Sequence, residues 1–202
     1  DGSTAKYEYN DHDQLRKESM VSASKPNHKP YRYEGTYTYY PDGALDTRSS
    51  SYGTGKKLDG STVKYTYTPR NMVETITDVS KGHVVQYTYD LNDNITGIES
   101  HNGQDGNARA LFTKIHMDYN DLNQVEFVKF SDGSKGYSFA YDSMGNVATI
   151  EDTFKNTTSF KYDGINRLQE VKDPLNNRVE AGFTDFGNET ILRHYSGEEL
   201  LR

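Results

Sequence analysis

The sequence predicts an all-β fold built from tandem β-hairpins, and three observations support this prediction. A tyrosine doublet, Tyr-x-Tyr, returns along the chain at a near-fixed interval. A nine-residue segment at the start recurs almost unchanged further on. Asp, Asn and Gly residues, which form turns, follow most of the doublets. Together they predict strands that alternate with short turns over the whole chain.

The doublets define the repeat. Residues 1–9 (DGSTAKYEY) and 59–67 (DGSTVKYTY) differ at only two of nine positions, so the similarity is one of true repeats. The full doublets are Tyr7/Tyr9, Tyr37/Tyr39, Tyr65/Tyr67 and Tyr87/Tyr89, and the variants are Phe139/Tyr141 and Phe160/Tyr162.

The second aromatic of each doublet gives the length of one unit. These marks are Tyr9, Tyr39, Tyr67, Tyr89, Tyr119, Tyr141, Tyr162 and Phe183. They are separated by 30, 28, 22, 30, 22, 21 and 21 residues, so the unit has about 21 residues with insertions in the first, second and fourth intervals. We expect residues 1–202 to form a single array of about eight units.

Each unit reads as strand, turn, strand, turn. Tyr-x-Tyr has a period of two, which places both rings on one face of a strand. Most returning strands carry two apolar residues three apart, as in Val147/Ile150. A bulge or a strong twist would put such a pair on one face, so we predict a curved, spiralling antiparallel sheet. The other pairs are Val73/Ile76, Ile95/Ile98, Val125/Val128 and Leu168/Val171.

Turn residues punctuate both ends of the predicted strands. Asp90, Asp142 and Asp163 follow their doublets directly, and Gly145 lies within the turn 143–146. Asp, Asn and Gly favour such turns, because they tolerate left-handed backbone angles or bond local amides. A second turn before the next doublet is marked by Lys81-Gly82, Asp132-Gly133 or Asn176-Asn177.

These motifs resemble the RHS or YD repeats. The resemblance covers essentially the whole chain and is carried by residues 141–147 (YDSMGNV), 160–168 (FKYDGINRL) and 172–177 (KDPLNN). It implies a spiral β-sheet that closes into a hollow shell, of which this chain resembles a segment. It also implies a secreted or surface-displayed parent, such as a bacterial polymorphic toxin, a cell-wall-associated protein, a toxin complex or a teneurin, whose shell often encloses a C-terminal toxin domain.

The chain departs from the family pattern at several positions. Asn10, Tyr40 and Thr68 stand where the family prefers Asp, and Met117 replaces a first aromatic residue. The paired Asp-Pro-x-Gly motifs of the family's self-cleaving region are not visible, since only Asp173-Pro174 occurs. We therefore predict no self-cleavage.

Composition fits a shell wall better than an ordinary globule. The hydrophobic fraction is 33% and the mean hydropathy is -0.93, but 17 Tyr and 8 Phe supply large apolar surfaces with polar tips. The net charge of -7 disfavours nucleic acid as a partner. The sequence has no apolar run long enough for a membrane span and no signal peptide at its start. The absence of Cys is compatible with a bacterial extracellular protein.

No motif predicts catalysis, a metal or a cofactor. Gly53-Thr54-Gly55 lacks the third glycine of a dinucleotide site, and no Gly-x-Ser-x-Gly elbow occurs. Residues 90–94 begin like a calcium loop, but Ile95 and His101 stand where Gly and Glu are required, so a turn is the better interpretation. The histidines are scattered without ligand spacing. We expect a non-enzymatic protein whose insertions, residues 18–34, 46–62 and 99–113, are hairpin tips.

Two functional hypotheses follow. The first is structural: the array forms part of a shell wall, its rings are buried between hairpins, and its partners are neighbouring repeats and an enclosed toxin domain. The second is a carbohydrate- or cell-surface-binding module in which Tyr87, Tyr89, Tyr141 and Tyr162 are exposed and stack on glycans. Buried rings at Tyr87, Tyr89, Phe139 and Tyr141 would exclude the second hypothesis, and an exposed aromatic stripe would exclude the first. Open sheet edges also predict self-association.

Overall fold

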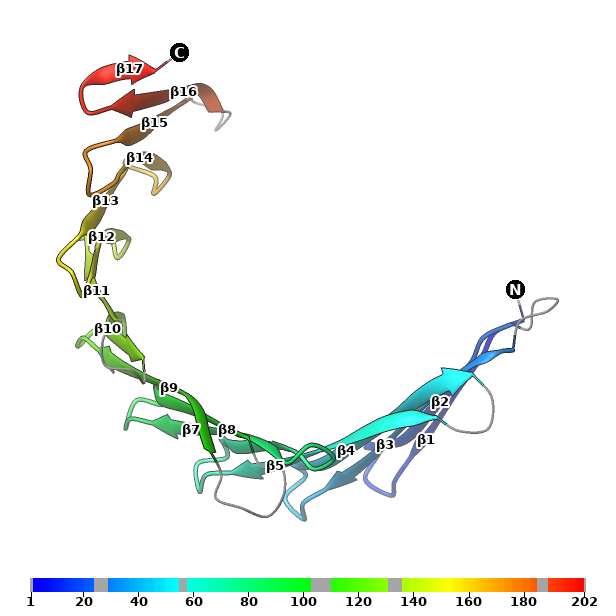
Figure 1. Cartoon of the computed structure of the whole chain (residues 1–202). Helices are drawn as coiled ribbons and strands as arrows, with labels where there is room; N and C mark the ends of the chain where they lie inside the picture. Colours follow the sequence, from blue (N-terminus) through cyan, green and yellow to red (C-terminus); the bar gives the residue numbers. More distant parts are fainter. Residues whose placement is uncertain are drawn as a thin grey trace. The chain divides into compact units, whose positions relative to one another are not determined.

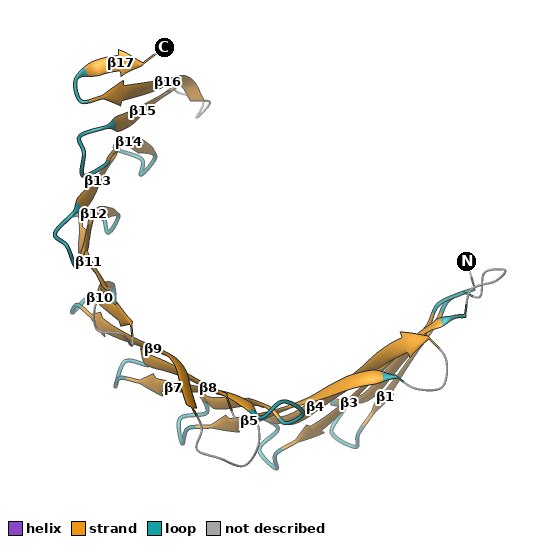
Figure 2. Ribbon diagram, viewed as in Figure 1, coloured by secondary structure: helices purple, strands orange, loops and turns teal. Residues whose placement is uncertain are grey.

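A computed structural model of the chain describes residues 2–23, 29–54, 58–102, 110–130, 136–184 and 189–201. All regular structure in these residues is β-strand, as Figures 1 and 2 show, and the strands number seventeen. The all-β class of antiparallel hairpin repeats is confirmed. The chain divides into two compact units. Unit 1 comprises Asp1–Thr88 and Gly97–Lys114, and unit 2 comprises Tyr89–Thr96 and Ile115–Arg202.

In unit 1 each strand is antiparallel to the strand before it in the sequence. The tyrosine doublets lie on β1, β3, β5 and β7, and the apolar pairs or their substitutes lie on the returning strands. The strands are β1 (Thr4–Tyr9), β2 (Leu15–Val21), β3 (Tyr31–Tyr39), β4 (Leu45–Thr54), β5 (Asp59–Tyr67), β6 (Val73–Asp78) and β7 (His83–Tyr89).

Unit 2 repeats this arrangement with shorter strands. Three strands have residues in both units, namely β7, β8 (Ile95–Asn102) and β9 (Ala110–Tyr119). The others are β10 (Val125–Phe130), β11 (Gly136–Tyr141), β12 (Val147–Asp152), β13 (Thr157–Tyr162), β14 (Leu168–Lys172), β15 (Arg178–Phe183), β16 (Glu189–Ser196) and β17 (Glu199–Leu201).

The doublet hairpins with an assigned register carry a bulge beside the second aromatic residue. Tyr141 lies opposite Val147, but Ala140 lies opposite Thr149, so one extra residue is inserted in the returning strand. The doublet Phe139/Tyr141 therefore faces Ile150 and Val147. The three-residue spacing predicted a bulge or a strong twist, and the bulge is present. Its extra residue absorbs the difference between the two-residue spacing of the doublet and the three-residue spacing of the apolar pair. Equivalent shifts occur beside Tyr9, Tyr39, Tyr67, Tyr119, Tyr162 and Phe183.

The turns after these doublets share one backbone design wherever the structure describes them, and residues 185–188 after Phe183 lie outside the described part. The Asp142 N–H donates to Asn146 O at 2.9 Å, and the Gly145 N–H donates back to Asp142 O at 3.1 Å. Gly145 has φ 87°, in the left-handed region that glycine adopts without strain. Asp and Asn tolerate the same region, and they fill this position at Asp13, Asn71, Asp93, Asn123 and Asn166.

The same design also closes two turns between successive doublet hairpins. Asp152 and Asp173 start these turns, and Lys155 and Asn176 take the left-handed position. The predicted turns at Lys81-Gly82 and Asn176-Asn177 are therefore present. The predicted turn at Asp132-Gly133 lies outside the described residues.

The insertions lengthen strands more than they add loops. Residues 18–21 belong to β2 and 31–34 to β3, while 46–54 and 59–62 belong to β4 and β5. The expectation of plain tips over 18–34, 46–62 and 99–113 was thus wrong for these parts. Tyr31 and Tyr33 continue the doublet alternation backwards, and the ladder from Tyr31–Thr54 to Tyr39–Leu45 follows it. Residues 24–28, 55–57 and 103–109 lie outside the described part.

Neither unit has a conventional core. Val84, at 2% exposure, is the one buried apolar side chain among the described residues. Most ring-bearing residues are half-buried, and Tyr7 and Tyr9 on β1 are 51% and 59% exposed. Each unit is thus held by backbone ladders and contacts between neighbouring hairpins, as expected for a repeat array.

Candidate functional site

The repeated contact between hairpins is a hydrogen bond from the second tyrosine of a doublet. Tyr141 donates its hydroxyl to Val125 O at 2.7 Å, and Val125 is the first residue of the returning strand in the preceding hairpin. The same bond recurs in both units, so it is a property of the repeat. Its other members are Tyr39 to Leu15 O, Tyr67 to Leu45 O, Tyr119 to Ile95 O and Tyr162 to Val147 O, at 2.8–3.1 Å.

These hydroxyls lie in partly desolvated positions. Burial raises the pKa of Tyr141 above its ordinary value. Burial also raises the pKa of Tyr119, with a smaller effect from the charge of Asp90. Both causes favour the neutral phenol. The hydroxyls of Tyr141 and Tyr119 therefore stay protonated and act as structural donors.

The residue after the doublet holds the turn through its side chain. Asp142 Oδ1 accepts the N–H groups of Met144 and Asn146, both at 2.9 Å, and Asp142 Oδ2 accepts Asn146 Nδ2 at 3.1 Å. The Asn146 side chain is the largest cause that lowers the pKa of Asp142. Asp163 repeats the pattern, with the Arg167 N–H as the largest cause that lowers its pKa. These carboxylates are therefore anionic turn caps.

Successive turns are also joined to one another. Asn146 Nδ2 donates to Asn166 Oδ1 at 2.9 Å, so the last residue of one turn bonds the left-handed residue of the next. Asn94 bonds Asn123 in the same way at 2.8 Å. Gln14 reaches Gly43 O in unit 1 at 3.1 Å. These side-chain amide bonds join neighbouring turns in both units, once in unit 1 and repeatedly in unit 2.

Opposite the first aromatic of the doublet, where other units have an apolar residue, unit 1 has polar side chains. They belong to a cluster that we call the Glu18 cluster (Glu18, Tyr33, Tyr37 and Arg48). Glu18 Oε1 accepts the hydroxyls of Tyr33 at 2.8 Å and Tyr37 at 2.6 Å. The Tyr37 bond is the largest cause that lowers the pKa of Glu18, and burial is the largest that raises the pKa of Tyr37. Gly35 makes room, because a Cβ there would lie 2.9 Å from Glu18 Oε1.

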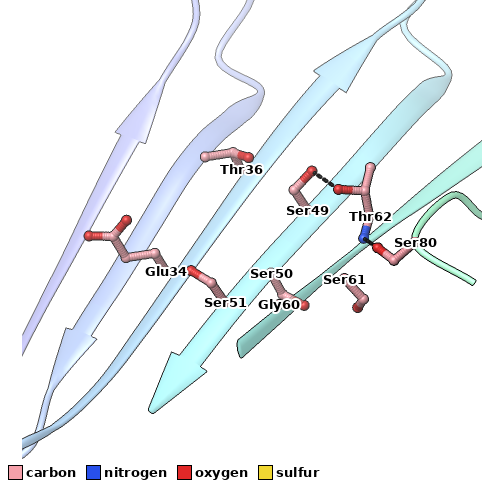
Figure 3. A pocket seen from close by; sticks show the side chains of 9 residues that line it. All are labelled: Glu34, Thr36, Ser49, Ser50, Ser51, Gly60, Ser61, Thr62 and Ser80. Atoms are coloured by element: carbon pink, nitrogen blue, oxygen red, sulfur yellow. Dashed lines mark hydrogen bonds between the residues drawn. The ribbon is translucent and has the colours of Figure 1, made fainter. Parts of the chain in front are cut away.

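The opposite face of unit 1 carries a shallow hollow lined by hydroxyl groups (Figure 3). Its volume is about 260 Å³. Ser49 Oγ and Thr62 Oγ1 bond each other at 2.8 Å, and the Thr62 N–H donates to Ser80 Oγ at 3.2 Å. The lining residues are Glu34, Thr36, Ser49, Ser50, Ser51, Gly60, Ser61, Thr62 and Ser80. The lining contains no histidine, and its one ionisable side chain is Glu34.

The four residues predicted to stack on glycans do not form an exposed stripe. Tyr87, Tyr89, Tyr141 and Tyr162 are all half-buried, as is Phe139. The rings are not buried as the shell hypothesis expected, because each keeps part of its surface exposed. The hydroxyls of Tyr141 and Tyr162 are bound to backbone carbonyls. Glycan stacking stays a prediction without a contact that favours it.

The remaining predicted residues occupy repeat positions. Tyr37 joins the Glu18 cluster, and Tyr65 faces Ile76 across β5 and β6. Phe160 faces Val171 across β13 and β14. In the 90–94 turn Asp90 Oδ1 accepts the N–H groups of Asn92 and Asn94, at 2.8 and 2.9 Å, which agrees with the turn interpretation.

No group of three or more His, Asp or Glu side chains in the described residues has metal-binding geometry. No helix in the described part is long and apolar enough to cross a membrane.

Sequence reasoning missed the Glu18 cluster and the caps at Asp152 and Asp173. One signal for the cluster was available: Glu18 and Arg48 stand three residues after Leu15 and Leu45, where other units have an apolar residue. The caps were also visible as an Asp four residues before an Asn, at Asp152/Asn156 and Asp173/Asn177.

The chain was compared with known proteins. No protein-family model matches it, and no curated protein does. Solved structures of toxin complexes do match. A crystal structure of TcdB2-TccC3-Cdc42 is 13% identical with a TM-score of 0.54, and the match covers 98% of this chain and 14% of that one. The Tc holotoxin pore of Photorhabdus luminescens, with a mutation in TccC3, is 14% identical with a TM-score of 0.53 and the same coverages.

A third structure, TcdB2-TccC3 without the hypervariable C-terminal region, is 14% identical with a TM-score of 0.53. At this identity the matches show the fold alone. The chain thus shares its fold with part of the Tc toxin chains, in agreement with the resemblance to RHS or YD repeats. It spans about one seventh of the length of these chains, since 14% of each is covered.

Proposed function

We propose that the chain is a non-enzymatic structural segment of a secreted or surface-displayed RHS/YD-repeat protein. The segment forms part of the wall of a shell that encloses a C-terminal toxin domain and helps to deliver it. Its partners are the neighbouring repeats of the parent chain and the enclosed domain. Its location is extracellular or at the bacterial cell surface.

The observation that carries this proposal is the bond between hairpins. The hydroxyl of the second tyrosine in a doublet joins its hairpin to the preceding one, as Tyr141 does by donating to Val125 O. These bonds join one hairpin to the next without a conventional core, since Val84 is the one buried apolar side chain in the described part. A sheet built in this way suits a wall, which needs area more than thickness.

The shared fold with Tc toxin chains supports the same function. The bulges support curvature, because a bulge bends its strand and increases the local right-handed twist. The turn caps support a non-enzymatic role, since Asp142 and Asp163 are bound by their own turns and are not free for chemistry.

Small-angle X-ray scattering on the size-fractionated monomer tests this proposal. A compact globule of 202 residues has a radius of gyration of about 16 to 17 Å. We expect a clearly larger value with the profile of a bent ribbon. A value at the globular limit would mean that the hairpins fold back on one another, and the shell-wall proposal would be abandoned.

A further inference from the structure

The turns of unit 2 carry large apolar side chains that project into solvent. We call a residue a turn tip when it is third in a five-residue turn and its N–H donates to the side chain of the first residue. The Met144 N–H donates in this way to Asp142 Oδ1 at 2.9 Å. The apolar turn tips are 66% to 79% exposed, and they are Leu122, Met144, Phe154, Ile165 and Leu175.

The turn itself does not require an apolar tip. The His12 N–H donates to Asn10 Oδ1 at 3.0 Å, and the Asn92 N–H donates to Asp90 Oδ1 at 2.8 Å, in turns with the same backbone bonds. Both of these tips are polar and exposed. Since large apolar side chains are unfavourable in water, their return at one turn position of unit 2 indicates a contact with another surface.

The apolar tips form two rows on opposite edges of unit 2 (Figure 1). The doublet edge consists of the turns that follow the doublets, and its apolar tips are Leu122, Met144 and Ile165. The return edge consists of the turns that join one hairpin to the next, and its described tips are Phe154 and Leu175. Successive tips of either row are two strands apart, which is about 9.5 Å. The two rows therefore have the same spacing, and the tips of one row fit between those of the other.

Charge distinguishes the two edges. The acidic residues in the turns of the doublet edge are Asp90, Asp93, Asp121, Asp142 and Asp163. The one cation in these turns, Arg167, is paired with Asp163 at 2.6 Å. On the return edge Lys155 follows Phe154 directly, with a side chain 81% exposed, and Lys172 precedes the second turn. The doublet edge therefore complements a return edge better than it complements another doublet edge.

We propose that the doublet edge of unit 2 binds the return edge of a second ribbon of the same repeat, with the apolar tips of the two rows packed between one another. The inference rests on the proposed function, in which the second ribbon is a neighbouring stretch of the same wall. For the isolated chain in solution it is a second copy. The contact joins two different edges, so it is heterologous and extends without closing. It adds width to a wall, whereas the tyrosine bonds between hairpins add length.

Two polar variants of the 202-residue chain test the proposal. The doublet-edge variant is L122S/M144S/I165S, and the return-edge variant is F154S/L175S. In concentration-dependent light scattering after size exclusion, we expect the wild-type mass to rise above the 23.0 kDa monomer and past the dimer. Each variant lacks one of the two edges, so its dissociation constant should rise about tenfold or more. The matched control is H12S, which changes a polar tip of unit 1 and should associate like wild type.

An equimolar mixture of the two variants gives the most specific result. Each variant keeps the edge that the other lacks, so the mixture should form a 1:1 complex and nothing larger. Circular dichroism and thermal unfolding check that both variants remain folded.

Three results would overturn the proposal. One is a wild-type chain that stays monomeric at all concentrations; if that monomer scatters as a bent ribbon, the proposed wall stands and only this contact is lost. Another is association that either variant retains alone, which would indicate pairing of like edges or of strands. The third is binding of the wild type to phosphatidylcholine vesicles without self-association, which would assign the tips to a lipid surface.

Discussion

In unit 2 the doublets on β11 and β13 are followed by Asp142 and Asp163, whereas those on β1, β3 and β5 of unit 1 are followed by Asn10, Tyr40 and Thr68. The backbone of the turn is the same in all five cases, with the first N–H donating to the carbonyl four residues on at 2.8–2.9 Å. The two units therefore reach one turn geometry with different side chains.

The acceptor in unit 1 comes from three sources. Asn10 Oδ1 accepts the N–H of Gln14 at 2.9 Å, as the Asp residues do. Thr68 Oγ1 accepts the N–H of Met72 at 3.2 Å. After Tyr40 the acceptor is Asp42, whose Oδ1 takes the N–H of Ala44 at 3.0 Å. The turn thus requires an oxygen at a point in space, and neither a charge nor one sequence position is essential.

A second difference lies opposite the first aromatic of the doublet. In unit 2 this position holds Ile150 and Val171, which lie opposite Phe139 and Phe160, and Val128, which lies opposite Met117. In the first two hairpins of unit 1 it holds Glu18 and Arg48. The polar pair replaces apolar contact with hydrogen bonds from Tyr33 and Tyr37, and these bonds orient the hairpins more specifically than packing does.

Acid should produce the largest difference in turn stability between the two units, because it protonates the capping Asp residues of several unit 2 turns at once. The pKa values of Asp142, Asp152, Asp163 and Asp173 are lowered from 3.8 in the folded state, mainly by hydrogen bonds within their turns. A lowered pKa contributes stability above the unfolded value, which is lost as pH falls through the folded value. We therefore expect unit 2 turns to lose amide protection below about pH 3.8 while the turns at Asn10 and Thr68 keep theirs.

Hydrogen exchange read by NMR at single amides measures this effect. The pKa of Glu18 is also lowered, so the titration should be repeated on Glu18→Gln, which removes that titration from unit 1. Equal loss of protection at Gln14 and Asn146 across pH 5 to pH 3 would contradict the expectation.

Exchange of the residues opposite the first aromatic should have the next largest effect. Ile150→Glu places a carboxylate opposite Phe139, which offers no hydroxyl, and should destabilise unit 2 by about 2 kcal/mol. Glu18→Ile, its counterpart, removes the shared acceptor of Tyr33 and Tyr37 and should cost about 1 kcal/mol. Urea unfolding followed by circular dichroism measures both.

The matched control is Glu18→Gln, which keeps an oxygen acceptor and should lie between wild type and Glu18→Ile. Equal losses of unfolding free energy in Ile150→Glu and Glu18→Ile would mean that only solvent exposure decides which residue is accepted opposite the first aromatic. The Glu18 cluster would then have no special role.

The fold was predictable because period and spacing fix it. Tyr-x-Tyr fixes a strand face, and the three-residue spacing of Val147 and Ile150 predicted a bulge or a strong twist; the bulge lies at Ala148. Asp142 and Gly145 predicted the turn through their intrinsic backbone preferences. Each of these inferences depends on neighbours in sequence, which a single chain displays.

The contacts between hairpins were not predictable in the same way. The bond from Tyr141 to Val125 O joins residues 16 apart, and nothing local to either residue signals it. The Glu18 cluster depends on Gly35, which lies beneath it on β3, and on two tyrosine hydroxyls from the same strand. The strands extend into the insertions because β3 and β4 pair there. The periodicity of one strand alone does not indicate this pairing, and both strands have to be considered together.

Removal of single tyrosine hydroxyl groups should have the smallest effect on stability, and it tests the hydrogen bonds between hairpins directly. Tyr141→Phe deletes the 2.7 Å bond to Val125 O and should cost about 1 kcal/mol, because a partly buried acceptor loses its donor. Tyr9→Phe removes a hydroxyl that bonds nothing in the described residues and should leave monomer stability unchanged. Urea unfolding at a concentration where both chains are monomeric compares them. Equal losses would show that the ring, and not its hydroxyl, joins the hairpins, and the bond between hairpins would no longer support a wall built one hairpin at a time.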